Sequence, residues 1–536
     1  DAVTNAFEVD TYDSATNSYT LRRTAKEYGT ELKTSGGHDS ERNTYLQAVL
    51  DYKNTFNEKH DVNAMFLFNR QEFNTKVTDL FSSLPRRKQG IAGRVSYSYD
   101  GRYMAEANFG YNGSENFAAN HRYGFFPSIA VGYNISNEKF WENIRPVISN
   151  LKLRASWGLV GNDNTLDTVG RFAYLEELSL TGAPSYKTGL PGGKYTGSGP
   201  KWTRYYTPDL RWEVGEKWNF GVDLQFCNSL NFTVEAFKDI YIPDAVIPDF
   251  LGMAGAKIYS NLGKMKNVGM DMSLDYGKQI NKNFFLSFKS TFTYAHNTIL
   301  YYNEPAFLDY PNLSRVGHSA DQWLLWVAHG LFPDEKTIKN NPTQNLGYAP
   351  QPGDIWYKNM PNRNGEYDSV IDANDRMWIG NPSTPEIIYG FGPSIRYKKW
   401  DFSFFFQGAA KTSILMSGMH PFGNVSIRGL FKYIADDHWS LDNPNINAKY
   451  PRLTKEDNDN NTKNSTYWLR NGSFLKLKNA EVGYTLRGWR FYVSGQNLLT
   501  FSPFDYWDPE MGSGSGLKYP TQRVINFGVQ VTFNNK

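Results

Sequence analysis

The stretch GVDLQFCNSLNFTVEAF, residues 221–237, decides the fold class of this chain. Val222, Leu224 and Phe226 alternate with polar residues, and the same period of two resumes after the middle of the stretch. Successive side chains of a β-strand point to opposite faces, so each half has one apolar and one polar face. The stretch therefore predicts a β-hairpin that turns near Asn228.

The same alternation recurs over most of the chain. Apolar and aromatic residues alternate with polar ones in further segments, which are residues 103–111, 284–289, 400–407 and 525–533. We count about sixteen strands in this way, and residues 1–13 are expected to end the first of them. Periodicity alone fits a soluble two-sheet sandwich as well as a membrane barrel, since strands of both have one apolar and one polar face.

Connection lengths separate these two folds, because they alternate along the chain. Short turns are expected at residues 57–59, 100–102, 228–230, 278–282, 398–399 and 487–488. Long connections are expected at residues 166–209, 243–260, 301–385, 417–471 and 502–521. Outer-membrane barrels have short periplasmic turns and long extracellular loops. Residues 1–536 are therefore predicted to be all-β, part of a transmembrane antiparallel β-barrel with these five connections outside.

Two local departures from this pattern are expected. Residues 137–149 are longer than the other turns on their side and are predicted to form a helical turn. Leu475 and Leu477 are out of phase with Ala480 and Val482, which predicts a β-bulge near Asn479.

Composition agrees with a barrel and excludes several other classes. Aromatic residues make up 16% of the chain, while its mean hydropathy is −0.57. A formal net charge of +3, from 57 basic and 54 acidic residues, does not indicate nucleic acid as a partner. The single cysteine, Cys227, excludes an internal disulfide within the chain and is expected to be an inert thiol. The sequence starts at Asp1 without a signal peptide, so we expect further sequence upstream of it.

Specific strings then resemble one family. The first run contains Arg122, Gly124, Phe126, Pro127 and Ser128, followed by NLKLRASWG at 150–158 and VGN at 160–162. The others are NLGK at 261–264 with Asn267, Gly269 and Asp271, GLF at 330–332, PGDI at 352–355, IGNP at 379–382, YGF at 389–391, FQG at 406–408, FLKL at 474–477, YVSGQNL at 492–498, DPE at 508–510 and YP at 519–520. In this order they resemble the SusC/RagA group of TonB-dependent transporters.

The resemblance implies a barrel of about 22 strands, of which this chain is the C-terminal portion. It implies a plug and a TonB-contacting segment upstream, and active uptake of an oligomeric nutrient across the outer membrane of a Gram-negative bacterium. The implied partners are a SusD-like surface lipoprotein that acts as a lid, the plug portion of the same protein, the TonB complex and outer-membrane lipids, with a dimer of transporter–lid pairs. Lid hinging in this group involves loops that correspond to residues 166–209 and 243–260.

The long connections are rich in aromatic residues that suit a sugar ligand. The candidates for substrate binding are Trp202, Trp323, Trp326, Trp356, Tyr357 and Trp378. Sugar rings stack on aromatic faces, so these residues favour an oligosaccharide, although large loops also bury aromatic rings in order to fold. Peptide importers share the same framework. A passive porin, a surface adhesion barrel and the soluble sandwich remain as other classes.

No enzyme and no cofactor is expected. The chain has neither a Gly-x-Ser-x-Gly nor a His-Glu-x-x-His motif, and the acidic run at residues 456–459 is expected to be a solvated loop. A calcium-loop-like run is degenerate, because Tyr367 stands where calcium loops have glycine. The weak candidate ligands in that run are Asn362, Asn364, Glu366 and Asp368. An ordinary surface turn is the preferred interpretation, without a metal.

Overall fold

The computed structural model describes residues 7–13, 18–23, 40–75, 84–163, 172–182, 185–188, 195–242, 245–247, 258–304, 309–417, 432–454 and 456–533. The chain divides into two units, residues 1–44 with 72–86, and residues 45–71 with 87–536. In the first unit, β1 (Phe7–Asp13) pairs antiparallel with β2 (Ser18–Arg23). No helix of the described residues has the length and apolar character needed to cross a membrane.

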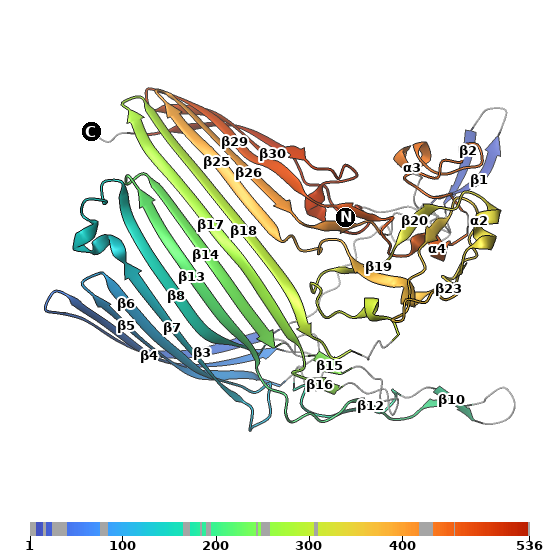
Figure 1. Cartoon of the computed structure of the whole chain (residues 1–536), viewed down its shortest axis with the longest axis horizontal. Helices are drawn as coiled ribbons and strands as arrows, with labels where there is room; N and C mark the ends of the chain where they lie inside the picture. Colours follow the sequence, from blue (N-terminus) through green and yellow to red (C-terminus); the bar gives the residue numbers. More distant parts are fainter. Residues whose placement is uncertain are drawn as a thin grey trace. The chain divides into compact units, whose positions relative to one another are not determined.

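A sheet of fifteen strands dominates the second unit (Figure 1). Its strands, in spatial order, are β3 (Glu41–Phe56), β4 (His60–Thr75), β5 (Arg86–Tyr99), β6 (Tyr103–Ser114), β7 (Tyr123–Asn134), β8 (Ile148–Asn162), β13 (Glu213–Phe226), β14 (Leu230–Ile242), β17 (Lys264–Asn281), β18 (Phe284–Tyr301), β25 (Ile387–Tyr397), β26 (Trp400–Ala410), β29 (Phe474–Leu486), β30 (Trp489–Phe501) and β31 (Val524–Val531). Consecutive sheet strands are therefore always neighbours, the simplest topology for a long antiparallel sheet. The predicted fold class is confirmed.

The hairpin predicted from residues 221–237 is β13 with β14, in continuous register from Val214 opposite Ile242 to Phe226 opposite Leu230. Its turn holds Cys227 and Asn228 at positive φ, a conformation that tight hairpins require. The N-terminal strand was placed wrongly. Residues 7–13 do not join the large sheet, because their backbone pairs locally with Ser18–Arg23.

The alternation of connection lengths is confirmed. Tight turns at one end join the strands at residues 57–59, 100–102, 227–229, 282–283, 398–399 and 487–488. The long connections at the other end are residues 163–212, 243–263, 302–386, 411–473 and 502–523. One predicted turn, 278–282, was too long, because β17 continues to Asn281 opposite Phe284.

Both predicted local departures are present. Residues 135–147 contain two short 3-10 turns, η1 (Ile135–Asn137) and η2 (Lys139–Trp141). Against β26, the register of β29 shifts between Leu477 and Asn479, which leaves Lys478 as the extra residue of a bulge. The register also shifts here against β30, where the extra residue lies on β30.

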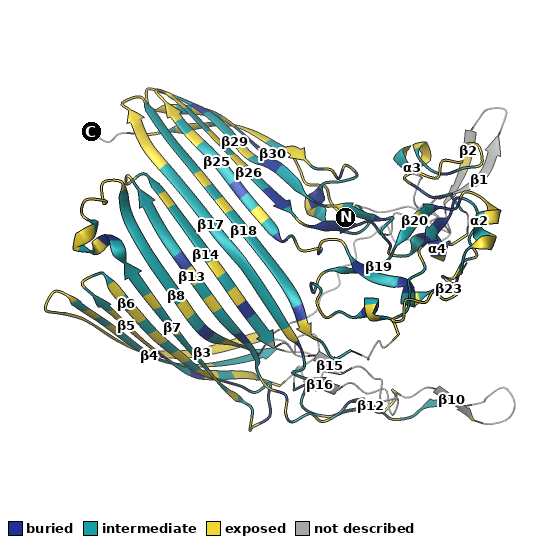
Figure 2. Cartoon of the chain, in the orientation of Figure 1, coloured by how far each residue is buried: buried dark blue, intermediate teal, exposed yellow. Residues whose placement is uncertain are grey.

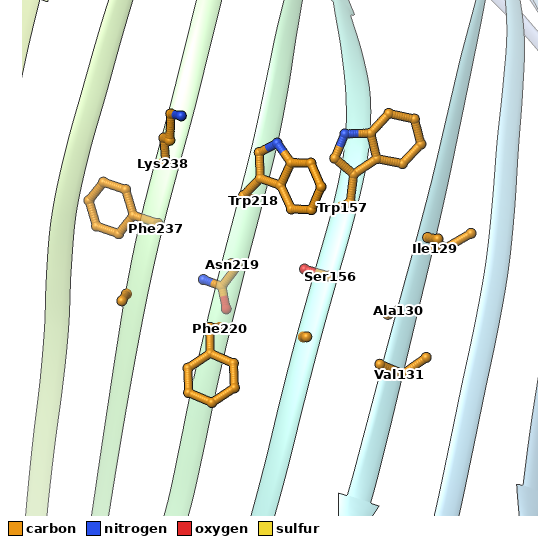
Figure 3. Close-up of a pocket in the computed structure, with 12 residues that line it drawn as sticks. Ile129, Ala130, Val131, Ser156, Trp157, Trp218, Asn219, Phe220, Phe237 and Lys238 are labelled. Atoms are coloured by element: carbon orange, nitrogen blue, oxygen red, sulfur yellow. The ribbon is translucent and has the colours of Figure 1, made fainter.

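The two faces of the sheet differ in polarity, as the alternation predicted. A cross-strand row on one face runs through Val95, Ala107, Ile129, Trp157 and Trp218. Several of these large apolar side chains are about half exposed, and exposed positions recur along the strands in Figure 2. A shallow hollow of about 500 Å³ lies on this face between the rings of Trp157, Trp218 and Phe220 (Figure 3). We call this surface the apolar face.

Small elements fold within the long connections. Paired strands there are β9 (Glu177–Ser179) with β12 (Lys201–Arg204), β10 (Ser185–Thr188) with β11 (Tyr195–Ser198), β15 (Ala245–Ile247) with β16 (Ile258–Ser260), β19 (Trp323–Trp326) with β24 (Arg376–Ile379), β20 (Ala328–Leu331) with β22 (Ile355–Tyr357), β21 (Thr343–Gln344) with β23 (Val370–Ile371) and β27 (Ser413–Leu415) with β28 (Leu469–Asn471). The helices are η4 (Pro311–Leu313), α2 (Glu335–Asn340), η5 (Ala373–Asp375), α3 (Lys432–Asp436), α4 (Asp459–Thr462) and η6 (Pro509–Met511).

Candidate functional site

The largest buried cluster of the described residues lies in the long connections and not in the sheet. It comprises Leu325, Leu331, Leu346, Ile355, Tyr357, Ile371, Ile414, Leu415, Met416, Ile434, Trp439, Ala448, Tyr450, Trp468 and Phe504, and we call it the loop core. These residues come from three connections, 302–386, 411–473 and 502–523. Packing them together fixes the three connections to one another, so this end of the sheet carries a folded body.

A buried carboxylate organises the polar groups of the loop core. Asp354 has no exposed surface, and its Oδ1 lies 2.8 Å from Nε of Arg452. The side-chain amides of Asn458 and Asn461 donate to the same oxygen at 3.1 and 2.9 Å. The backbone N–H of Gln351 donates to Oδ2 at 2.8 Å. A buried charge is tolerated only when it is paired and fully hydrogen-bonded, and Asp354 meets that condition.

Three asparagines within and directly after the acidic run are buried. Asn458, Asn460 and Asn461 have no exposed surface, which corrects the expectation of a solvated loop at this point, although Glu456 and Asp459 are exposed as expected. Two of these side chains form hydrogen bonds with the backbone of Ile355 at the edge of β22. The side-chain amide of Asn460 donates to the carbonyl of Ile355, and the side-chain carbonyl of Asn461 accepts from the N–H of Ile355. Short strands inside a loop need such partners because they lack a continuous sheet.

The arginine beside Asp354 stays charged. Burial acts to lower the pKa of Arg452, but the hydrogen bond and charge of Asp354 outweigh burial and raise that pKa above its ordinary value. Arg452 also donates to the hydroxyl of Tyr348 at 3.1 Å. The loop core therefore contains a paired salt bridge at neutral pH.

Five of the six predicted substrate-binding residues lie in one connection, 302–386, and most of them are structural. Tyr357 is fully buried and its hydroxyl donates to the carbonyl of Asn460 at 2.7 Å. Trp378 is 9% exposed and its indole donates to the carbonyl of Leu313. Trp323 and Trp326 pack against the loop core. Their rings are used to fold the connection.

Trp356 and Trp202 are the more accessible candidates. Trp356 is half-buried, with its ring parallel to Phe332 at 5.4 Å and beside His329 at 4.1 Å between centroids. Trp202 is 39% exposed on β12, a strand of another connection. The structure therefore does not bring all six rings into one surface.

The calcium-loop-like run forms a hydrogen-bonded turn. The side-chain oxygen of Asn362 accepts from the backbone N–H groups of Asn364 and Glu366, and the Asn362 amide donates to the Glu366 carboxylate. Asp368 accepts from the hydroxyl of Tyr310 at 3.0 Å. No group of three or more His, Cys, Asp or Glu residues suited to a metal was found in the described part of the chain.

The second face of the sheet is lined with polar and paired charged side chains. Arg154 contacts both Asp223 and Glu235, which are its neighbours across β13 and β14. Arg490 contacts Asp401 and Glu481 in the same manner on β26, β29 and β30. Smaller groups on this face are Arg94 with Glu106, Lys217 with Asp239 and Thr293 with Asp271. We call this surface the polar face.

A buried lysine joins the connection 502–523 to the sheet. Lys476 is 1% exposed, and its ammonium group lies 2.5 Å from carboxylate oxygens of both Asp508 and Glu510. Burial acts to raise the pKa of Asp508, but hydrogen bonds from Lys476, the Glu510 backbone and Thr521 outweigh it and lower that pKa. The ion pair is therefore formed at neutral pH.

Sequence reasoning missed Asp354, Arg452 and Lys476 as site residues. Asp354 stands in the PGDI string, whose Gly353 has φ +87, and a Cβ there would lie 2.2 Å from the Trp439 ring. The ring that packs against this glycine is more than eighty residues away in the sequence. The residues around Gly353 therefore do not reveal the contact. The strings 352–355 and 474–477 did mark these regions as similar to known proteins, but without a structural role.

Comparisons with known proteins agree with this architecture. Residues 2–498 match a family model described as TonB dependent receptor-like, beta-barrel. TonB-dependent receptor P26 of Formosa agariphila is 28% identical over 478 residues, 82% of this chain and 46% of that protein. TonB-dependent receptor SusC of Bacteroides thetaiotaomicron is 26% identical over 466 residues, 82% of this chain and 43% of that protein.

One solved structure with a similar fold is that of the RagAB peptide transporter. Its TM-score is 0.70 with 21% identity, covering 92% of this chain and 56% of that chain. The chain spans about half the length of the curated relatives it matches.

Asp354→Ala is expected to unfold the loop core while leaving the sheet intact. Removing one partner of a buried ion pair costs about 3–5 kcal/mol, and here it also leaves three donors unpaired. Limited proteolysis should cut residues 432–454 much faster in this variant, while heat-modifiable gel mobility of the barrel is unchanged. Asp442→Ala, at an exposed position of the same connection, is the control, and equal cleavage of the two variants would refute the assignment.

The docking of connection 502–523 is expected to weaken in acid. Because the folded pKa of Asp508 lies below its ordinary value of 3.8, its stabilisation is present above that value and is lost as the pH falls through the folded pKa. Hydrogen exchange of residues 505–516, corrected for intrinsic rates, should rise below pH 4 in the natural chain. Asp508→Asn should exchange fast at every pH, whereas the exposed Asp505→Asn should follow the natural profile.

Proposed function

The chain belongs to the family of TonB dependent receptor-like β-barrels, and on that premise we propose that it forms the wall and outer loops of an importer for an oligomeric nutrient. It is an outer-membrane β-barrel chain of the SusC/RagA type, and this family is not enzymatic. The resemblance found in its strings is thereby confirmed.

The contrast between the two faces of one sheet carries the proposal. The apolar face suits contact with lipid, while the polar face, with Arg154, Arg490 and their carboxylates, suits a water-filled interior. A soluble sandwich would bury its apolar faces against each other, but large apolar side chains such as Ile129, Val131 and Phe220 are more than half exposed. The sheet therefore suits a pore wall.

The edges of the sheet support a larger assembly. In the described residues, β3 and β31 end the strand order and do not pair with each other. Open edges are not viable in lipid, because unpaired backbone groups find no water there. We propose that further strands of the same protein close the wall, that its plug fills the interior, and that the TonB complex acts through that plug.

The loop core suits the extracellular mouth of this importer. It fixes three long connections into one body, which is a stable platform for a partner. We propose that the partner is a SusD-like surface lipoprotein, with residues 166–209 and 243–260 as the hinging loops and with pairs of such complexes forming dimers.

We propose an oligosaccharide as the substrate class, bound in part by Trp356 and Trp202. Their accessible rings support this choice, since sugar C–H faces stack on indoles. A peptide is the second candidate, because the similar RagAB structure is described as a peptide transporter. Both substrates suit a polar interior that carries paired charges and amides.

Thiol labelling tests the orientation. Cys227 is exposed in a tight turn, so a membrane-impermeant maleimide should label it only after the outer membrane is permeabilised. In a Cys227→Ser background, Leu441→Cys, at a position 87% exposed in a long connection, should be labelled in intact cells without the lipoprotein. Labelling with the opposite sidedness would reverse the orientation.

Uptake measurements test the function. Cells with the full-length protein should accumulate labelled oligosaccharides only when TonB is present, and Trp356→Ala should weaken binding about five- to tenfold through loss of ring contact. Phe140→Ala, an exposed aromatic at the short-turn end, is the control. Uptake of oligopeptides alone would favour the second candidate, and uptake without TonB would contradict active import and favour a porin.

A further inference from the structure

A pocket of about 160 Å³ lies where β4, β5, β6 and β7 reach the end of the sheet that carries the long connections. Its lining contains four cations and one carboxylate, and the residues are Arg70, Arg87, Lys88, Gln89, Gly113, Glu115, Arg122 and Tyr123. Such an excess of positive charge in a small concave site favours an anionic group.

Two of the four cations, Lys88 and Arg87, have carboxylate partners within the protein, so the available charge is that of Arg70 and Arg122. Lys88 pairs with Asp163 at 2.7 Å, and Arg87 lies 3.8 Å from Glu115. Within the described ranges, Arg70 and Arg122 form no ion pair. The Nε atom of Arg122 is buried and has no hydrogen-bond acceptor there. A buried guanidinium nitrogen without an acceptor is costly, and a bound oxyanion would supply the acceptor.

The pocket opens along the apolar face. Gln89, Gly113 and Tyr123 form the cross-strand row that continues the alternation of that face, above Tyr111 and its partners. Gln89 donates to the hydroxyl of Tyr123, and the Tyr123 ring stacks on Tyr111 at 5.1 Å. Aromatic rings of this kind mark the level of lipid headgroups in a barrel.

A separate apolar hollow of about 390 Å³ lies further along β4, β5 and β6. Its lining includes Phe66 and Ala64 on β4, Gly93 and Val95 on β5, and Ala107 and Phe109 on β6. Gly93 and Gln89 are four residues apart on β5, about 13 Å at the rise of a strand. The Phe109 ring packs over Gly93, where a Cβ would lie 2.3 Å from it, so this ring forms part of the wall of the hollow.

We propose that these two features form one site for a phosphorylated acyl lipid of the outer leaflet, lipid A in a Gram-negative outer membrane. The phosphate binds among Arg70, Arg87 and Arg122, and an acyl chain lies in the hollow over Ala107, beside the Phe109 ring. Free phosphate would use only the cationic pocket. A phosphorylated lipid would use both the pocket and the apolar hollow, which lie about one lipid headgroup apart. The site uses the orientation proposed above but does not depend on what the importer carries.

The test is native mass spectrometry of the full-length protein purified in mild detergent and titrated with lipid A. The triple variant Arg70→Gln, Arg87→Gln and Arg122→Gln should bind lipid A on the order of a hundredfold more weakly, since each cation near a headgroup contributes about a factor of five. The matched control removes three exposed lysines from the tight turns, Lys59→Gln, Lys282→Gln and Lys399→Gln, and should bind as the natural protein does.

Further arms identify the ligand. Enzymatically dephosphorylated lipid A should bind the natural protein as weakly as lipid A binds the triple Gln variant. The triple Lys variant at the same positions should retain most of the affinity, and Ala107→Phe should lower it by filling the hollow. Heat-modifiable gel mobility verifies that every variant is folded.

Equal binding of lipid A by the triple Gln variant and the lysine control would overturn the proposal. Inorganic phosphate that binds as tightly as lipid A, or a lipid A affinity that Ala107→Phe leaves unchanged, would overturn the lipid as the ligand. Thiol labelling of Cys227 is independent of these readouts, so a reversed orientation and a failed lipid site are distinguishable.

Discussion

The hydrogen-bonding demand of the backbone in lipid is the constraint on which the rest of this structure depends. Every N–H and C=O that crosses the hydrocarbon needs a partner within the protein, and a sheet supplies those partners only between neighbouring strands. Consecutive strands therefore pair antiparallel all along the sheet, with turns as short as two residues at one end. Side chains alternate between the two faces because successive residues of a strand point to opposite sides of the sheet, which allows one face to be apolar and the other polar.

Because of this constraint, the main core of the described residues lies outside the sheet. Among the described residues, neither face of the sheet is buried against a second layer, so sheet side chains remain largely exposed or half-exposed (Figure 2). The long connections bury apolar residues in a core of their own. They do so around Asp354, where Arg452 and two asparagine amides replace the water that a carboxylate loses on burial.

Local rules were sufficient to predict the sheet from the sequence. The period of two located the β13–β14 hairpin, a phase change located the bulge of β29 at Lys478 against β26, and connection lengths separated the two ends. The loop core could not be predicted in this way. Asn458 is buried because its amide meets a carboxylate 104 positions earlier, and an Asn-rich run has the same composition whether it is solvated or buried. For the same reason, the sequence did not distinguish the structural role of Tyr357 and Trp378 from a role in ligand binding, because an aromatic residue suits both.

The charges of the polar face also follow from what a pore wall must do. Arg154 and Arg490 each face two carboxylates, so the guanidinium donors are satisfied within the wall and the local charge is small. In the proposed importer, a solute would meet weak and repeated polar contacts along this wall, and weak binding at several sites permits both entry and exit. Strong unpaired charges on this face would retain an oppositely charged solute. Arg70 and Arg122, which have no ion-pair partner among the described residues, line instead the proposed lipid site at β4–β7, where a bound anion would not obstruct the proposed pore.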